Sequence, residues 1–386
     1  MQRLAIITTH PVQYYAPIFQ LLRSRERIAI KVFYTAGESG NSFDRDFGKD
    51  IVWDLPLLSG YAYEWVVNKA GDPGTHHFNG VVTPGLKKQV MDWDPHAVLI
   101  IGWAYRSHLS ALRYFKNRIP VLFRGDSTLL DERGGLRSGL KKIALSWIYR
   151  HIDLAFYTGQ QNKSYFLAYG VPEKKLIFAP HAVDNERFYH SEKGKVNLLR
   201  QQFMINDNDI LVLFAGKFTE KKSPLTLLKA FQQLGKPGLH LLFAGNGVLE
   251  DELMAASAHD KRIHFLGFQN QSVMPALYQS ADLFCLPSSG PGESWGLAVN
   301  EAMAAGKAVL VSDKAGCAAD LVKNEVNGAV FNSSSAESLS AALEGLTFDK
   351  ERLMAMGAQS LELIKPWNFL AIVTALERAV LNFEKI

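Results

Sequence analysis

Short apolar runs alternate with helical patterns along almost the whole chain, and this alternation constrains the fold more than any other feature. The runs have the length and composition of buried strands. They cover residues 4–8, 28–34, 97–101, 121–123, 154–157, 211–215, 239–244, 263–266, 283–286 and 308–311. Helical patterns between them cover residues 16–23, 107–116, 137–152, 224–233 and 271–280. The order predicts an α/β protein whose parallel sheets carry helices on both faces.

The run of strand–helix units breaks near Pro180, and a polar stretch follows as far as Asn208. We expect this stretch to connect two Rossmann-like, doubly wound domains, residues 1–185 and 186–366. A C-terminal helix, 367–386, is expected to pack back on the first domain. Because such sheets bind ligands beyond the carboxyl ends of their strands, two facing domains would form a cleft there.

Composition excludes several classes of protein. A net charge of +4 on 386 residues is too small for a nucleic-acid-binding protein, although it suits anionic ligands. Cys285 and Cys317 have no metal-ligand spacing and are expected to be reduced packing residues. No apolar run is long enough to span a bilayer, and the N-terminal run is too short for a signal peptide. We therefore expect a cytoplasmic protein.

The segment from Glu293 to Gly306 places two carboxylates, Glu293 and Glu301, on either side of the start of a predicted helix. The free N–H groups and partial positive charge of a helix N-terminus suit a phosphate. Carboxylates beside a phosphate would be repelled unless they accepted hydroxyl hydrogen bonds. A sugar nucleotide offers hydroxyls on both sides of its diphosphate, so the segment predicts a sugar-nucleotide site.

Three lysines, Lys217, Lys221 and Lys222, follow the strand that ends at Gly216. They precede a helix whose N-cap we expect to be Ser223. The spacing does not fit a Walker A loop. An anion site and a solvated loop both remain open.

The next strand ends in Gly245, Asn246 and Gly247, without the third glycine of a dinucleotide fingerprint. These glycines fit either a close approach to a ligand or a tight turn. Phe268, expected to be exposed at the following strand end, either borders a nucleobase or packs in the core.

Taken together, these motifs resemble the retaining glycosyltransferases of family 4 (glycosyl transferases group 1). Such proteins have the GT-B fold, in which two Rossmann-like, doubly wound domains face a central cleft. The resemblance spans about residues 210–331. It rests on Gly216-Lys217 with Lys222, residues 245–247, 266–268 and 281–288, and the segment from Glu293 to Gly306.

The resemblance implies a role for each matching residue. Glu293 would bind hydroxyls of the transferred sugar and Glu301 those of the ribose, while Lys217 and Lys222 neutralise the diphosphate. The family more often has Arg in place of Lys217, which keeps the charge but lacks the planar fork. The remaining donor-binding residues would be Gly216, Gly245, Asn246, Phe268, Ser294, Trp295, Gly296 and Leu297.

The first domain departs from the family, because the loop after its first strand contains no glycine. His10 in that loop either orients an acceptor or a leaving phosphate, or simply packs. Asp126, after the strand at 121–123, either contacts an acceptor hydroxyl or caps a turn.

No metal or other cofactor is expected besides the donor substrate. His76-His77 lies in a loop bordered by glycine and proline, with no carboxylate at ligand spacing. The Asp44-Arg-Asp46 pattern is interpreted as a solvated loop.

The stretch 133–151 is basic and carries an apolar side. It either covers the first sheet or rests on anionic lipid at the inner face of the membrane, and in the second case the acceptor would be lipid-linked.

The predicted function is retaining transfer of a hexosyl group (EC 2.4) from a nucleoside-diphosphate sugar. The acceptor would be a glycan, a lipid-linked molecule or a small molecule, and no nucleic acid is involved. A sugar-nucleotide epimerase and a non-catalytic sugar-nucleotide-binding protein are the alternatives.

Overall fold

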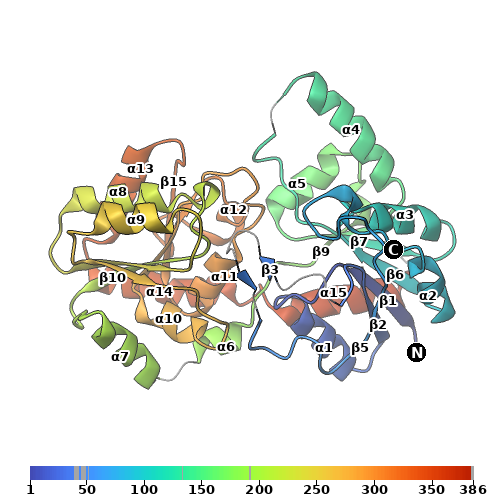
Figure 1. The fold of residues 1–386 in the computed structure, drawn as a ribbon, viewed down its shortest axis with the longest axis horizontal. Helices are drawn as coiled ribbons and strands as arrows, with labels where there is room; N and C mark the ends of the chain where they lie inside the picture. Colours follow the sequence, from blue (N-terminus) through green and yellow to red (C-terminus); the bar gives the residue numbers. More distant parts are fainter. Residues whose placement is uncertain (39–42, 45–48, 51, 133, 191–192, 384–386) are drawn as a thin grey trace. The chain divides into compact units, whose positions relative to one another are not determined.

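The computed structural model describes residues 1–38, 43–44, 49–50, 52–132, 134–190 and 193–383. The chain forms two compact units (Figure 1). The first unit comprises Met1–Phe43, Asp50–Pro180 and Phe369–Ile386, and the second comprises Asp44–Lys49 and His181–Asn368.

The first unit is built on a parallel sheet of seven strands. These are β1 Arg3–Thr8, β2 Ala29–Tyr34, β5 Ala62–Trp65, β6 Ala97–Ile101, β7 Val121–Arg124, β8 Leu154–Tyr157 and β9 Leu176–Phe178. They lie in the order β5-β2-β1-β6-β7-β8-β9. The helices are α1 Ala16–Ser24, α2 Leu86–Asp92, α3 Arg106–Phe115, α4 Leu136–Tyr149, α5 Gln160–Ala168 and α15 Phe369–Leu381. Helices α2 to α5 contribute to one buried apolar cluster, and α15 packs against α1.

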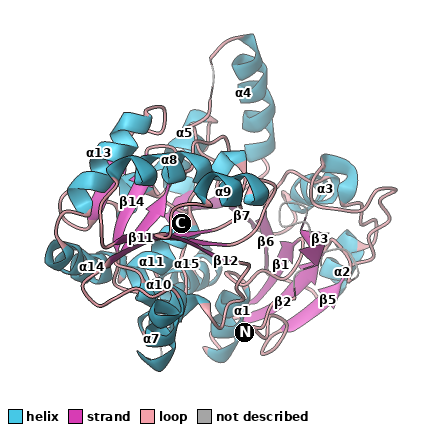
Figure 2. Ribbon diagram, turned by 60° about the vertical axis from the view of Figure 1, so that its left-hand side comes forward, coloured by secondary structure: helices cyan, strands magenta, loops and turns pink. Residues whose placement is uncertain are grey.

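The second unit is built on a parallel sheet of six strands. These are β10 Ile210–Ala215, β11 Leu239–Ala244, β12 Ile263–Leu266, β13 Leu283–Leu286, β14 Ala308–Ser312 and β15 Gly328–Phe331. They lie in the order β12-β11-β10-β13-β14-β15. The helices are α6 Asn185–Tyr189, α7 Lys193–Gln202, α8 Pro224–Leu234, α9 Glu250–Ser257, α10 Met274–Ser280, α11 Leu297–Ala304, α12 Ala318–Leu321, α13 Ala336–Leu346 and α14 Lys350–Ile364. Figure 2 shows α8, α9 and α13 on one face of this sheet and α10, α11 and α14 on the other. A short ladder of β3 Phe43–Asp44 and β4 Lys49–Asp50 completes the fold.

Each large sheet has one point at which the chain order reverses. In the first unit this point lies between β1 and β6, and in the second between β10 and β13. The loops that leave the two flanking strands diverge to opposite faces, so ligands of doubly wound sheets bind beside such a point. In the second unit, these are the loops after Ala215 and after Leu286.

The predicted class, two Rossmann-like α/β domains, is confirmed. One detail is wrong: the polar stretch after Pro180 is not a connection. It contains α6 and α7, and Arg200 of α7 donates to the carbonyl of Ser280 at 2.9 Å and to Asp282 Oδ2 at 3.3 Å. These bonds fix the stretch inside the second unit, whose longer segment begins at His181. Within the described residues, no helix is both long and apolar enough to cross a bilayer.

Candidate active site

Two loops meet at the reversal point of the second sheet. The loop after β10 carries the three lysines, and the loop after β13 carries Ser288 and Ser289. Ser223 Oγ lies 2.6 Å from Ser289 Oγ, and the Ser289 N–H donates to the carbonyl of Lys221 at 3.0 Å. The lysine loop is therefore held in place rather than free in solvent.

Ser223 is the N-cap residue of α8, as the sequence predicted, but its side chain does not bond to the first turn of the helix. The residue has φ +52°. Its Oγ bonds instead to the carbonyl of Glu220 at 3.0 Å and to Ser289. The hydroxyl is used to join two loops, which explains why it forms no capping bond.

Glu293 is the centre of the site. It is 7% exposed, forms an ion pair with Lys222, and accepts a hydrogen bond from Ser288 Oγ at 2.8 Å. Burial acts to raise the pKa of Glu293, but the charges of Lys222 and Lys221 and the hydrogen bonds from Lys222 and Ser288 outweigh it. The pKa of Glu293 therefore lies below its ordinary value, and the side chain is an anion at neutral pH.

The main chain from Glu293 to Trp295 is held by hydrogen bonds from Gly316 and Cys317. The carbonyl of Glu293 accepts from the N–H of Gly316 at 3.0 Å, and that of Trp295 accepts from Cys317 at 3.0 Å. A Cβ on Gly316 would lie 1.8 Å from the Ser294 carbonyl oxygen, so only glycine permits this approach. This segment leads directly into α11.

Helix α11 begins at Leu297 without a side-chain cap. Its N-cap is Gly296, with φ +101°, which has no side chain to bond the first turn. The first N–H groups of a helix need an outside partner, and an anion is the partner that the helix dipole favours. Lys217, on the lysine loop, is half-buried. A diphosphate needs N–H donors and positive charge. The first turn of α11 can supply the donors, and Lys217 and Lys222 can supply the charge.

The Trp295 side chain is buried in the second unit. It is 4% exposed, and its Nε1 donates to Asn300 Oδ1 at 2.8 Å. Asn300 in turn donates to the carbonyl of His181 at 3.1 Å. The side chain of Trp295 is therefore not available to a ligand, which leaves only its main chain for the donor-binding role expected from the sequence.

Glu301 lies in α11, as predicted, and is 3% exposed. Its Oε2 accepts from the hydroxyl of Tyr278, on α10, at 2.8 Å. Sequence reasoning missed Tyr278, because it lies on a separate helix with no local signal. The bond orients the Glu301 carboxylate.

Gly216, Gly245 and Asn246 shape the neighbouring loops. A Cβ on Gly245 would lie 1.9 Å from the Gly216 carbonyl oxygen, so the close approach here is between two stretches of the chain itself. Asn246 Oδ1 accepts from the Phe268 N–H at 2.7 Å, and its Nδ2 donates to Glu250. Phe268 is half-buried rather than exposed as expected, because Asn246 holds its main chain against the preceding loop.

The candidate residues of the first domain lie in the first unit. His10 follows β1, and its Nδ1 lies 2.9 Å from Thr9 Oγ1; burial lowers its pKa. Asp126 follows β7 and is exposed. Sequence reasoning missed His108, which is fully buried between Thr35 Oγ1 at 2.8 Å and the Gly102 carbonyl at 3.0 Å. Burial lowers the pKa of His108 to about 4.

The remaining sequence candidates are the two cysteines and the Asp44-Arg-Asp46 pattern, and of these Cys317 adjoins the site, because its N–H donates to the Trp295 carbonyl. Cys285 and Cys317 are buried free thiols, and burial raises the pKa of each. Asp44 lies in β3, and Asp46 lies outside the described residues.

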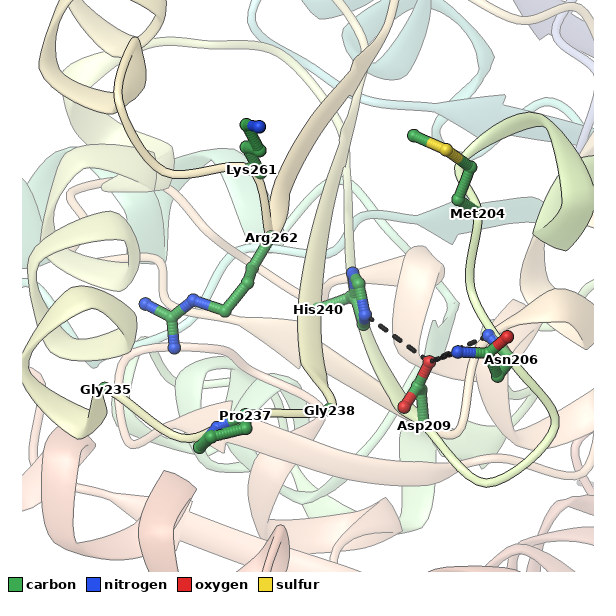
Figure 3. Close-up of a pocket in the computed structure, with 9 residues that line it drawn as sticks. All are labelled: Met204, Asn206, Asp209, Gly235, Pro237, Gly238, His240, Lys261 and Arg262. Atoms are coloured by element: carbon green, nitrogen blue, oxygen red, sulfur yellow. Dashed lines mark hydrogen bonds and ion pairs between the residues drawn. The ribbon is translucent and has the colours of Figure 1, made fainter.

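A cavity of about 510 Å³ lies at the amino ends of β10 to β12 (Figure 3). Its lining includes Asp209 and His240, which face each other with 3.6 Å between Oδ2 and Nε2. The lysine loop and Glu293 follow the carboxyl ends of the strands, so this cavity belongs to the opposite edge of the sheet.

Comparison with known structures identifies the fold. HepE of Anabaena, solved in complex with UDP and glucose, superposes with a TM-score of 0.74 at 18% identity, covering 99% of this chain and 100% of that chain. Sucrose-phosphate synthase from Thermosynechococcus elongatus superposes with a TM-score of 0.76 at 15% identity, covering 100% of both. The two Rossmann-like units thus match structures of GT-B glycosyltransferases.

Sequence comparison finds a family match within the second unit. Residues 196–362 match the family model described as Glycosyl transferases group 1. The chain is 28% identical over 221 residues to an uncharacterized glycosyltransferase of Methanocaldococcus jannaschii, covering 55% of this chain and 56% of that protein. It is 26% identical over 233 residues to a GDP-mannose-dependent phosphatidylinositol monomannoside mannosyltransferase of Mycobacterium tuberculosis, covering 57% and 60%. The chain spans little more than half the length of these relatives. The residues that match the family model lie within the second unit, which holds Lys217, Lys222, Glu293 and Glu301.

Proposed function

We propose that this protein is a retaining glycosyltransferase of family 4 that moves a hexosyl group from a nucleoside-diphosphate sugar to an acceptor hydroxyl. One observation carries the proposal: an ionised, buried Glu293 lies beside Lys222 and the uncapped start of α11. The group 1 domain and the GT-B fold point to the same chemistry. They favour transfer over the epimerase and the non-catalytic alternatives.

In this proposal the diphosphate binds to Lys217, Lys222 and the main-chain N–H groups of residues 294–297. Glu293 accepts hydrogen bonds from hydroxyls of the transferred sugar, and Glu301 accepts from the ribose. Lys222 pairs with Glu293 in the free protein and shares its charge with the phosphate when donor binds. The lysine charges stabilise the leaving diphosphate, so transfer needs no metal ion.

The reaction forms a bond between the acceptor oxygen and the anomeric carbon, while the bond from that carbon to the diphosphate oxygen breaks. A retaining glycosidase uses a carboxylate nucleophile about 5–5.5 Å from its acid. Glu293 and Glu301 are both assigned to hydroxyls, so we propose attack from the side of the departing group. The acceptor proton passes to the departing phosphate oxygen. His10 and Asp126 are proposed to position the acceptor.

The stretch 133–151 supports a peripheral membrane location. Helix α4 buries Leu145 and Ile148 in the first unit and leaves Leu140, Ile143 and Trp147 exposed. The helix therefore covers the sheet with one face and presents apolar side chains, next to lysines, on another. We propose that this face rests on anionic lipid at the cytoplasmic side of a membrane, and that the acceptor is a saccharide or a lipid-linked molecule of polysaccharide biosynthesis.

Nucleotide screening tests the proposal first. UDP, GDP and ADP are added to the protein, and one of them should raise the melting temperature, because a bound ligand stabilises the folded state. Glu293→Gln should then reduce transfer from the matching sugar nucleotide by at least about 100-fold, as removal of a transition-state contact does. Glu337→Gln, on α13, is the control and should transfer at the wild-type rate.

Incubation with donor alone separates transfer from epimerisation. A converted sugar nucleotide in the absence of acceptor would refute the transferase assignment. No stabilisation by any of the three nucleotides would refute the donor site itself.

A further inference from the structure

A well-anchored loop follows β5 in the first unit. Asn68 Nδ2 donates to the carbonyl of Gly80 at 2.8 Å, and the Gly74 N–H donates to the same oxygen at 3.1 Å. The hydroxyl of Tyr105, directly before α3, donates to the carbonyl of Thr75 at 3.1 Å. These bonds tie the loop at its base and its middle.

This loop brings Asp72, His76 and His77 together. Asp72 Oδ2 lies 3.4 Å from His76 Nε2 and 3.2 Å from His77 Nε2, and one ligand atom from each of the three residues lies within 4.8 Å of the others. The expectation that no carboxylate stands at ligand spacing from these histidines is therefore wrong. A turn at Pro73 and Gly74 folds Asp72 back toward His76, four residues later in the chain.

Gly74 makes room for this arrangement. A Cβ at this position would lie 2.5 Å from His76 Nδ1. Any other residue would push the imidazole away from Asp72. The glycine thus permits both histidine rings, whose centroids are 4.5 Å apart, to lie beside one carboxylate.

The spacing matches that of ligand atoms around a small divalent metal ion. Bonds of about 2.0–2.1 Å in tetrahedral geometry place neighbouring ligand atoms about 3.3 Å apart. Both distances from Asp72 Oδ2 agree with this value. Two imidazoles with one carboxylate are also a donor set that zinc and related transition metals favour.

A competing explanation is a simple network of hydrogen bonds. His77 Nε2 also lies 3.0 Å from the carbonyl oxygen of Asp72, so the ring can donate a proton there in the metal-free protein. Such a bond does not account for a second imidazole at the same carboxylate. A metal ion replaces that proton and uses all three side chains.

We propose that Asp72, His76 and His77 bind one divalent transition-metal ion of the zinc class. The side chains of both histidines are about one-third exposed and that of Asp72 is 71% exposed, so the remaining coordination positions are open to water. The proposal is independent of the proposed transfer reaction, whose donor residues all belong to the second unit.

Calorimetric titration of Zn²⁺ into the untagged full chain, stripped of metal by chelator, tests the proposal. We expect saturable binding of one ion per chain. His76→Ala and His77→Ala should each weaken this binding by more than the roughly 10–100-fold that loss of an outer partner costs. Asp72→Asn, which keeps the side-chain volume, should also weaken it. Co²⁺ should give a visible absorption band that is lost in the same variants.

Two further variants make the test specific. His190→Ala removes an imidazole that lies 3.3 Å from the carboxylate of Glu186 in the second unit, and this variant should bind Zn²⁺ like the wild type. His264→Ala removes the partner that lies 3.1 Å from His240 Nδ1 in the second unit. Zn²⁺ binding that is lost in His264→Ala but kept in His76→Ala would overturn the assignment, as would the absence of saturable binding to the wild type. Unchanged melting curves without metal would show that the variants fold.

Discussion

Removal of the Lys222 ammonium is expected to destabilise the protein through Glu293. Lys222→Met keeps most of the side-chain volume but leaves a carboxylate that is 7% exposed without its cation. Breaking a buried ion pair by removing one partner costs about 3–5 kcal/mol. The Lys222 side chain is 21% exposed, and Ser288 still donates to Glu293, so we expect a loss nearer to about 2 kcal/mol.

A double-mutant cycle measures this interaction. Urea unfolding at pH 7 should give a lower free energy of unfolding for Lys222→Met than for the wild type. Adding Glu293→Gln should recover most of the loss, because the amide that replaces the carboxylate carries no charge. Recovery would appear as a coupling energy of about 1–2 kcal/mol between the two positions.

The pH dependence gives an independent check. In the wild type the pKa of Glu293 is lowered, so its stabilising contribution is present above the unfolded-state pKa and is lost as pH falls through the folded-state pKa. Without Lys222, only Lys221 and Ser288 oppose the effect of burial, so we expect the pKa of Glu293 to rise. The deficit of Lys222→Met should then shrink as pH falls from 7 toward 5. A variant as stable as the wild type at pH 7, or a deficit that Glu293→Gln leaves unchanged, would refute the reasoning.

Three further perturbations probe other parts of the structure. Gly316→Ala should lower both the stability of the protein and its nucleotide binding, since the added Cβ would lie 1.8 Å from a loop carbonyl oxygen. Gly345→Ala in α13, where a Cβ meets no neighbouring atom, should instead stabilise the protein by about 0.5–1 kcal/mol in thermal unfolding. The wild type should lose about 3 kcal/mol of stability between pH 6.5 and 4, because the buried His108 has a pKa of about 4 and its protonation favours the unfolded chain. His108→Gln should reduce this loss, and an unchanged pH profile would contradict the reasoning. Ile143→Glu should weaken co-sedimentation with vesicles that contain anionic lipid. Met254→Glu, which changes an exposed apolar residue of α9, should not.

Local patterns were sufficient to predict most of the buried strands. The buried strands β6, β10 and β13 appear in the sequence as uninterrupted apolar runs, because both of their faces are covered by helices. The edge strand β5 was missed, since Tyr63 and Glu64 interrupt its apolar character. Strand β9 was missed for a similar reason: only three residues form it, and none is fully buried.

The site was predictable where its residues are close in sequence. Glu293, Glu301 and the start of α11 belong to one segment, and its pattern predicted both the loop and the helix. The bonds from Ser288 to Glu293 and from Tyr278 to Glu301 depend on how strands and helices pack, and no local pattern marks them. The Asp72 cluster was misjudged because a turn, rather than a regular element, brings the carboxylate to the histidines.

The placement of α15 has a practical consequence for work on isolated parts of the molecule. Glu377 of α15 is 1% exposed and accepts bonds from Arg25 at 2.8 Å and from Arg27 at 3.1 Å, both in the first unit. A fragment that ends at Pro180 would strip these arginines of their counter-ion and uncover the apolar side of α1. An independently folding version of this half calls for residues 369–386 to be spliced back through a linker or supplied as a separate peptide.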